Sequence, residues 1–396
     1  MVDYYRDTWA EINLDAVAAN VENMKAHLAK DVQIMAVVKA DGYGHGAVQT
    51  AQTALASGAS WLGVALLDEA IALRQAGIRA PILVLGWTRP SDINLAERLN
   101  ISLTVFQKEW MDAASAAYKG KAPVFIHLKC DTGMGRLGVR SKEEMTELIK
   151  AIKSDPRFIV EGAFTHFATA DETDRRYFDL QYTRFEEMLG WLETLRINPN
   201  IIHCGNSAAA LKHPSKMFNL IRFGIAMYGL SPSLEMKPDL PFPLQEAFAL
   251  RSRLVHVKKI AAGEAVSYGA TFKAEAPTWI GTIPIGYADG WLRRLSGKAS
   301  VLVSGRRMPI VGRICMDQMM CQLDQAYPVG EAVTLIGEAD GRAIPIDEIA
   351  GYLETINYEV PCMISKRVPR LYFKNGKKIH MTNSILNKLD INCEWP

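Results

Sequence analysis

Eight short apolar runs alternate with helix-like segments between Ile34 and Phe223, and this alternation constrains the fold more than any other feature. Alternating strands and helices are typical of a parallel sheet. Eight units in about 200 residues predict a closed (β/α)8 barrel of the TIM type rather than an open sheet. The runs are Ile34–Val38, Trp61–Leu66, Ile82–Leu85, Ile101–Val105, Val124–Leu128, Ile159–Thr165, Ile201–Cys204 and Leu220–Phe223.

A proline-rich stretch, Ser231–Leu244, ends the alternation and is typical of a linker. Short β-like runs follow it, with a single predicted helix at Ile346–Tyr352. The piece Trp9–Leu14 predicts a strand before a helix capped by Asp15. We therefore expect an α/β protein with a barrel over residues 14–240, followed by a mainly β C-terminal domain. That domain is expected to comprise residues 1–13 and 241–385, with a tail at 386–396. The later runs are Phe248–Ile260, Trp279–Pro284, Lys298–Val303, Met308–Met316, Met319–Leu323 and Ala332–Ile336.

Composition excludes several classes of protein. A net charge of +2 gives no electrostatic reason to expect nucleic acid or an anionic membrane as a partner. The charged N-terminus lacks the apolar core of a signal peptide, and no apolar run is long enough to cross a membrane. The six cysteines form no C-x-x-C pair, which is typical of reduced thiols. We expect a cytoplasmic protein without a metal site.

The stretch AVVKADGYGHG, Ala36–Gly46, places Lys39 at the end of the first barrel strand, before a glycine-rich loop. Burial lowers the pKa of a lysine and leaves an amine able to attack a carbonyl. Backbone N–H groups in such a loop can approach an anion. Together they suggest a Schiff-base cofactor with a phosphate, pyridoxal phosphate, with the Tyr43 phenol on that phosphate. The alternative is a lysine that merely ends a strand.

The other strand ends are also polar, and active sites of such barrels lie at the carboxyl ends of the strands. Lys129 ends the fifth strand with Asp131 close by as a counter-charge, and Arg136 could clamp a carboxylate. His127 is interpreted as a core histidine. His166 could lie near a cofactor ring, and Ser207 could cap a helix, bind phosphate, or do both. In the last strand and after it lie Arg222, Gly224 and Ile225, the last two with N–H groups for the same phosphate.

These segments resemble the alanine racemase family of pyridoxal-phosphate enzymes, across both domains and in the same order. The matching segments are AVVKADGYGHG, KCDTGMGRLG, THFATAD, HCGNSA, RFGIAMYGL, VSYGATF, IGYADG and GRICMDQ. One departure is Gly205, where many members have alanine. The resemblance implies racemisation of alanine by two-base proton transfer on a pyridoxal phosphate aldimine, supplying D-alanine for peptidoglycan.

The resemblance also implies a role for each matched residue. Lys39 would hold the cofactor and act as the base on one face of the substrate. Tyr268 of a second subunit would act as the base on the opposite face. The protein would therefore be a homodimer with shared active sites. Arg222 would contact the pyridine nitrogen and His166 would contact Arg222. Phosphate contacts would come from Tyr43, Ser207, Gly224, Ile225 and Tyr358. Arg136 and the Met316 N–H would bind the substrate carboxylate, carbamylated Lys129 would orient Arg136, and Tyr287 would lie in the access channel.

Three other functions are compatible with parts of the pattern. A broader amino-acid or serine racemase of the same fold would need more room around Tyr268, Tyr358 and Met316 than a methyl group occupies. A basic amino-acid decarboxylase would need an acidic partner for the pyridine nitrogen, where Arg222 stands. A pyridoxal-phosphate homeostasis protein would be a lone barrel, whereas this chain has a second domain and Tyr268.

Overall fold

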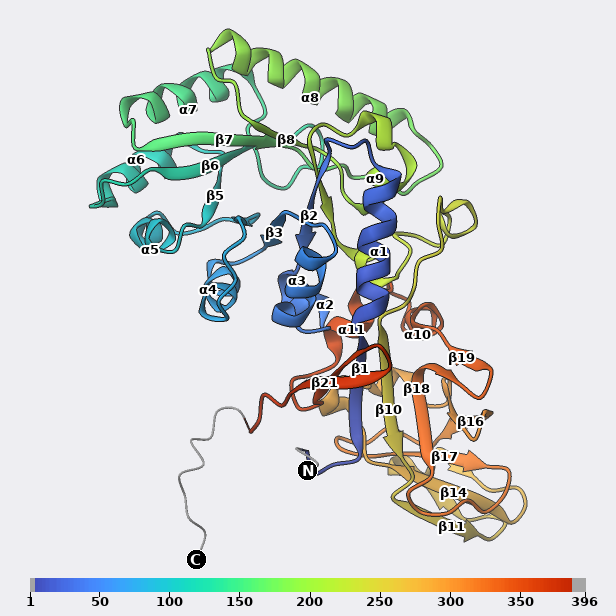
Figure 1. Cartoon of the computed structure of the whole chain (residues 1–396). Helices are drawn as coiled ribbons and strands as arrows, with labels where there is room; N and C mark the ends of the chain where they lie inside the picture. The colour runs from blue at the N-terminus through green and yellow to red at the C-terminus, as the bar shows by residue number, and fades with distance from the viewer. Residues whose placement is uncertain (1–3, 387–396) are drawn as a thin grey trace, which may run out of the picture. The chain divides into compact units, whose positions relative to one another are not determined.

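The computed structural model describes residues 4–386, which form two compact units (Figure 1). The barrel unit comprises Ala16–Tyr43 and Ala47–Gln245. The β unit comprises the described residues up to Asp15, Gly44–Gly46, and the chain from Glu246 onward. Apart from its first residue, the predicted tail 386–396 lies outside the described residues. No helix among residues 4–386 is long and apolar enough to cross a membrane.

The barrel unit is built on an eight-stranded parallel sheet, in the order β8-β7-β6-β5-β4-β3-β2-β9. The two end strands approach each other, since the Arg222 N–H donates to the Gly205 carbonyl at 2.9 Å, and the sheet forms a nearly closed barrel. This confirms the predicted fold. The strands are β2 (Gln33–Val37), β3 (Trp61–Val64), β4 (Ile82–Val84), β5 (Ser102–Val105), β6 (Val124–Lys129), β7 (Phe158–Phe164), β8 (Ile201–His203) and β9 (Leu220–Phe223).

Helices lie outside the strands of this unit (Figure 1). Strands β3, β4, β5 and β9 are buried along their whole length, because both faces of the sheet are covered. Burial on both faces favours the mainly apolar runs seen in the sequence. The helices are α1 (Leu14–His27), α3 (Ala47–Ala56), α4 (Leu67–Gln75), α5 (Ile93–Arg98), α6 (Lys108–Ala117), α7 (Lys142–Ser154), α8 (Arg176–Thr194) and α9 (Ser207–Lys212). The predicted cap of α1 was wrong by two residues, because Asn13 Oδ1 accepts the Asp15 N–H at 3.0 Å.

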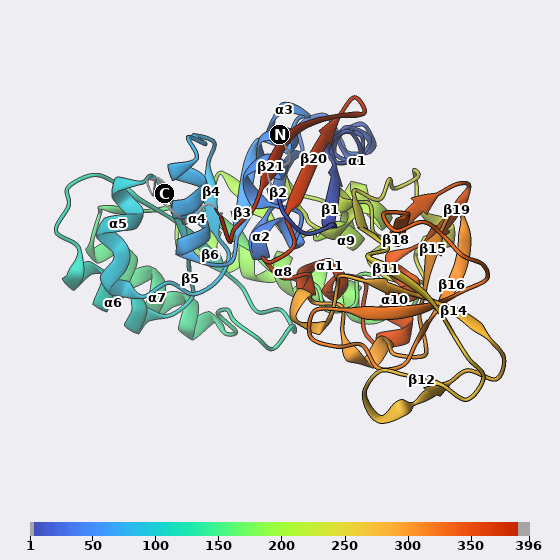
Figure 2. The ribbon, with the colours of Figure 1, turned by 90° about the horizontal axis from the view of Figure 1, so that it is seen from below.

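The β unit holds an 11-stranded sheet in the order β11-β14-β17-β16-β15-β18-β10-β1-β20-β21, with β19 beside β18. The first strand, β1 (Thr8–Asn13), pairs with β10 (Phe248–Arg253) and β20 (Arg370–Lys374), which joins the two ends of the chain in one sheet. Figure 2 shows β12 (Ala265–Val266) in a loop that projects from the rest of this unit. The remaining strands are β11 (His256–Ile260), β13 (Phe272–Lys273), β14 (Thr278–Ile283), β15 (Ser300–Val303), β16 (Arg306–Val311), β17 (Met319–Leu323), β18 (Ala332–Ala339), β19 (Arg342–Ile344) and β21 (Lys377–Thr382).

Three predictions for the β unit were wrong in detail. The predicted single strand Phe248–Ile260 is two strands, β10 and β11, with a break after Arg253. Strand β16 ends at Val311 because Gly312 has a φ of 68°, a left-handed conformation that ends the extended run. A second helix, α11 (Glu359–Met363), follows the predicted one, α10 (Ile346–Leu353). It is too short to give a helical periodicity in the sequence.

Candidate active site

Lys39 stands at the carboxyl end of β2 and opens a left-handed turn, α2 (Lys39–Tyr43). Ala40, Asp41 and Tyr43 have φ values of 52°, 53° and 53°. Each non-glycine residue in this conformation costs roughly 1–2 kcal/mol. Strained backbone of this kind is concentrated at functional sites, where the surrounding structure holds it in place. The turn places the half-buried Lys39 with its Nζ 5.9 Å from the centre of the Tyr43 ring.

Glu69, at the start of α4, holds this turn from the neighbouring strand end. Its carboxylate accepts the backbone N–H groups of Ala40 at 2.6 Å, Ala65 at 2.8 Å and Leu66 at 3.1 Å. One side chain therefore fixes both the strained turn after β2 and the loop after β3.

We expect Glu69→Ala to lower the free energy of unfolding by about 1–3 kcal/mol, because three backbone N–H groups lose a charged acceptor. Urea unfolding measures this loss. Asp68→Ala, at an exposed position of the same helix turn, is the control and is expected to be nearly neutral. Equal stability of the two variants would contradict the assigned role of Glu69.

Three polar groups that were expected to bind phosphate gather where β9 ends: the Ser207 hydroxyl, the Tyr43 phenol and the Ile225 N–H. The buried Ser207 Oγ accepts the Gly224 N–H at 3.0 Å and the Ala226 N–H at 3.5 Å. A Cβ on Gly224 would lie 2.8 Å from the Tyr43 hydroxyl, so only glycine lets this phenol come so close to the backbone. The N–H of the buried Ile225 has no acceptor among the described residues. A buried N–H without a partner is rare and points to an acceptor from outside the chain.

Ser207 is not the cap of its helix. Asn206 precedes it, and the Asn206 Oδ1 accepts the Ala209 N–H at 2.9 Å. Of the two roles considered for Ser207, the cap is therefore wrong. The hydroxyl instead faces the loop after β9.

Arg222 is buried on β9 with 4% of its surface exposed. Its NH1 donates to the His203 carbonyl at 3.1 Å and lies 3.0 Å from His203 Nδ1. Its NH2 donates to the Thr165 and Cys204 carbonyls and lies 3.1 Å from His166 Nδ1. Burial lowers the pKa of Arg222 to about 10, so the guanidinium stays charged at neutral pH. Burial, followed by the charge of Arg222, lowers the pKa of His166 well below its usual value.

Lys129, the last residue of β6, is buried among cations. Burial, followed by the charges of Arg222 and Arg136, lowers its pKa to about 7. The charge of Asp131 raises the pKa of Lys129, as expected of a nearby counter-charge, but burial and the arginines outweigh it. The Asp131 Oδ1 also accepts the N–H groups of Gly133 and Gly135 and so shapes the loop. Lys129 Nζ donates to the Cys130 carbonyl at 3.3 Å and lies 4.9 Å from the centre of the Phe164 ring.

The departure at Gly205 has a packing reason. A Cβ at this position would lie 2.1 Å from the Met217 Sδ. Alanine at 205 is therefore incompatible with Met217 in its present position.

In the β unit, Tyr268 follows β12 and exposes 69% of its surface. Ser267 before it has a φ of 68°, and its Oγ donates to the Arg313 carbonyl at 2.5 Å. Met316 is 53% exposed, and its carbonyl accepts the Ala288 N–H beside Tyr287 at 3.1 Å. Tyr358 is half-buried directly before α11.

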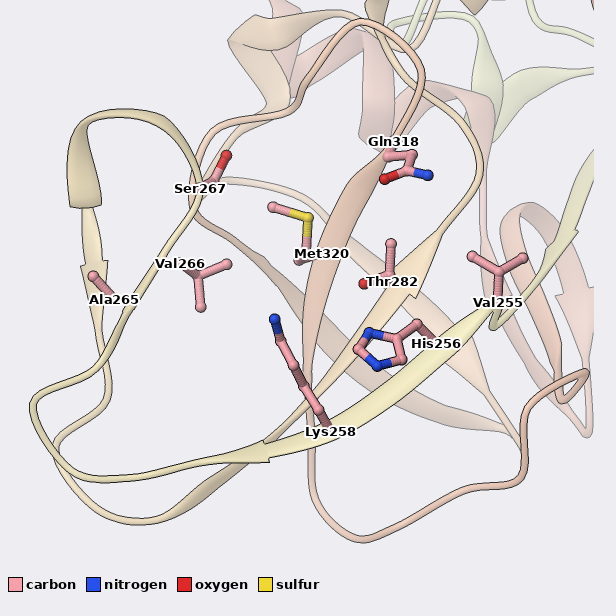
Figure 3. Close-up of a pocket in the computed structure, with 9 residues that line it drawn as sticks. All are labelled: Val255, His256, Lys258, Ala265, Val266, Ser267, Thr282, Gln318 and Met320. Atoms are coloured by element: carbon pink, nitrogen blue, oxygen red, sulfur yellow. The ribbon is translucent and has the colours of Figure 1, made fainter.

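A hollow of about 470 Å³ lies beside the Tyr268 loop, within the β unit (Figure 3). Ser267 stands at its edge, and the side chains of Lys258, His256 and Met320 lie between that loop and the strands (Figure 3). The loop therefore borders a hollow on this side, although Val266 is itself buried in a small hydrophobic cluster. The lining residues are Val255, His256, Lys258, Ala265, Val266, Ser267, Thr282, Gln318 and Met320.

Sequence reasoning missed Glu69, His203 and Glu161, and it treated His127 only as a core residue. Glu69 holds the turn after β2, and the other three are linked by hydrogen bonds to one another and to Arg222. A signal existed for His203, because it is a polar residue at the end of the short strand β8. Glu69 and Glu161 gave none, because an isolated glutamate on a helix or strand is ordinary.

These features define a protein with a barrel unit and a β unit, in which a lysine ends the first barrel strand and an arginine is buried on the last. Sequence models of the alanine racemase N-terminal domain and C-terminal domain match residues 12–232 and 247–372. The chain belongs to the alanine racemase family.

Individual relatives agree with this assignment. Alanine racemase of Geobacillus stearothermophilus is 58% identical over 97% of this chain and 98% of its own. Alanine racemase 1 of Bacillus subtilis is 52% identical over 97% of each chain. The crystal structure of Bacillus anthracis alanine racemase with bound L-Ala-P is 48% identical, covers 98% of this chain and 100% of its own, and superposes with a TM-score of 0.95.

Proposed function

We propose that this chain is an enzyme that interconverts L-alanine and D-alanine with pyridoxal 5'-phosphate as its cofactor. The observation that carries the proposal is that Lys39, Arg222 and the polar groups around Ser207 and Ile225 all lie on or directly after strands of the barrel. Near-full-length identity to proteins named alanine racemase supports the same reaction.

The donor set fits the cofactor. Ser207, Gly224, Ile225 and Tyr43 would hold the phosphate, joined by Tyr358 of the β unit, and the N–H of Ile225 needs such an acceptor. When bound, the cofactor supplies an electron-withdrawing ring that eases loss of the substrate Cα proton. Arg222 would face its ring nitrogen, held by His166. A guanidinium with a pKa of about 10 donates a hydrogen bond but keeps its proton, which disfavours side reactions such as transamination.

Two bases would act on opposite faces of the substrate Cα. The Lys39 amine would take or return the proton on one face, and the Tyr268 phenol would act on the other. Tyr268 would belong to a second subunit, which gives a homodimer with shared active sites. The exposure of Tyr268 within its own unit supports this arrangement. Arg136 and the Met316 N–H would bind the substrate carboxylate, and Tyr287 would lie in the access channel.

Lys129 is proposed to be carbamylated and so to orient Arg136. As an ammonium it is opposed by the charges of Arg222 and Arg136, whereas a carbamate anion would attract both. The reaction joins the neutral amine to CO2 and releases one proton.

Because only the neutral amine reacts and the pKa of Lys129 is about 7, carbamate formation is expected to rise as the pH increases through 7. The carbonyl signal in ¹³C NMR with labelled bicarbonate measures it. Lys129→Gln is expected to lack the signal, and Lys30→Gln at an exposed position is expected to keep it. A carbamate signal of equal strength in Lys129→Gln would contradict the assignment.

The biological role follows from the reaction. The product would supply D-alanine for peptidoglycan, and the enzyme would act in the cytoplasm without nucleic-acid or membrane partners.

The domain boundaries 14–240 and 241–385, with residues 1–13 added to the second domain, stay a prediction.

Circular dichroism with L-alanine and L-serine as parallel substrates tests the proposed specificity. We expect loss of the L-alanine signal and at least about tenfold slower loss with L-serine, because an added hydroxyl must be accommodated. Equal rates would favour the broader racemase.

A further inference from the structure

A chain of polar side chains crosses the interior of the barrel unit from Glu161 to Arg222. Glu161 Oε2 lies 3.2 Å from His127 Nε2, and His127 Nδ1 lies 3.0 Å from His203 Nε2. His203 Nδ1 in turn lies 3.0 Å from Arg222 NH1. Barrel interiors of this kind are normally filled by apolar side chains. Both histidines are completely buried.

The hydrogen-bonding capacity of each group fixes the direction of the whole chain. A guanidinium only donates, so His203 Nδ1 must accept from Arg222. A neutral His203 then carries its proton on Nε2 and donates it to His127 Nδ1. His127 consequently carries its own proton on Nε2 and donates to the Glu161 carboxylate. All three bonds therefore point from Arg222 toward Glu161.

The charges agree with this direction. Burial lowers the pKa of both His127 and His203, which keeps the two imidazoles neutral. Burial opposes ionisation of Glu161, but hydrogen bonds from His127 and Ser102 outweigh it and lower the pKa of this carboxyl. Among the described residues, Arg222 has carbonyls and imidazoles as its hydrogen-bond partners, and no carboxylate. The Glu161 carboxylate therefore ends a hydrogen-bonded chain that begins at Arg222 and passes through two neutral rings.

The surrounding residues hold the rings in this geometry. A Cβ on Gly162 would lie 2.3 Å from His127 Nδ1, so glycine is needed for this ring to fit. Phe164 stacks on His203 with the ring centres 4.6 Å apart and the planes 5° apart. Trp61 meets His127 edge-on at 5.5 Å. The side chains are therefore locked by packing as well as by hydrogen bonds.

We propose that Glu161, His127 and His203 are positioning residues that fix the orientation and hydrogen-bond direction of Arg222 from inside the barrel. Their action on catalysis rests on the proposed function, in which Arg222 faces the cofactor ring. The positions of the protons in the chain Glu161–His127–His203–Arg222, here called the relay, do not depend on the proposed function.

Histidine-selective ¹⁵N NMR of the full chain with bound pyridoxal phosphate tests the relay, with His127→Gln and His203→Gln assigning the signals. We expect both wild-type histidines to be neutral with the proton on Nε2. In Glu161→Gln, the His127 Nε2–H resonance is expected to move upfield, the absorbance maximum of the bound cofactor to shift, and kcat to fall about tenfold. Ser102→Ala is the matched control, since Ser102 donates to the same carboxylate outside the relay. It is expected to change kcat less than twofold.

A proton on Nδ1 of either wild-type histidine would overturn the proposal, and this measurement decides even if Glu161→Gln fails to fold. A fall in kcat with unchanged histidine signals, or changed signals with unchanged kcat, would also overturn it. Absence of both cofactor binding and racemisation in the wild type would refute the proposed function instead, and the tautomers would still be measurable.

Discussion

Lys39→Ala is expected to abolish racemisation, with a loss of about 10³-fold or more, and to abolish covalent attachment of the cofactor. The reason is that Lys39 combines two roles, as the amine that holds the cofactor and as one of the two bases. Borohydride reduction followed by peptide mass analysis measures the attachment. The wild type is expected to carry the cofactor on the peptide that contains Lys39.

Lys129→Ala is the informative control, because Lys129 is the other lysine at a strand end and its pKa is lowered to about 7. It is expected to keep the cofactor attached through Lys39. Retained attachment in Lys39→Ala together with loss in Lys129→Ala would show that the roles of the two lysines are exchanged.

Tyr268→Phe is expected to slow proton removal from one enantiomer of alanine by about 10²- to 10⁴-fold and to affect the other far less. Phenylalanine keeps the ring but has no hydroxyl to exchange a proton. Initial rates of solvent-deuterium incorporation into L- and D-alanine, each measured alone, report the two directions. Tyr5→Phe, at a 90% exposed position of the same unit, is the control and is expected to be neutral. Equal slowing of both enantiomers would contradict a two-base arrangement.

Much of the fold was predictable because strands covered on both faces must be apolar. The runs Trp61–Leu66 and Leu220–Phe223 lie on strands β3 and β9 of the parallel sheet. The β unit was harder. Strand β21 (Lys377–Thr382) is charged and exposed along much of its length, and only pairing with β20 identifies it as a strand. Its sequence carries no burial pattern to detect.

The candidate site was likewise predictable from the sequence only in part. Lys39 and Arg222 were found because a charged residue at the end of an apolar run is conspicuous. The left-handed turn at Ala40–Tyr43 was not predictable, since Ala40 and Tyr43 do not favour positive φ and Glu69 holds Ala40 from another element. Asp131 was expected as a counter-charge to Lys129, and its charge does raise the pKa of that lysine. Its hydrogen bonds to the N–H groups of a tight loop were not predictable from nearness in sequence.

The central claim is tested most directly by circular dichroism of the purified chain with pyridoxal phosphate, started separately from L-alanine and from D-alanine. The account predicts that both signals decay to zero, because the two enantiomers have equal free energy, and that alanine is fully recovered. Decay from neither enantiomer, or loss of signal accompanied by consumption of alanine, would contradict it.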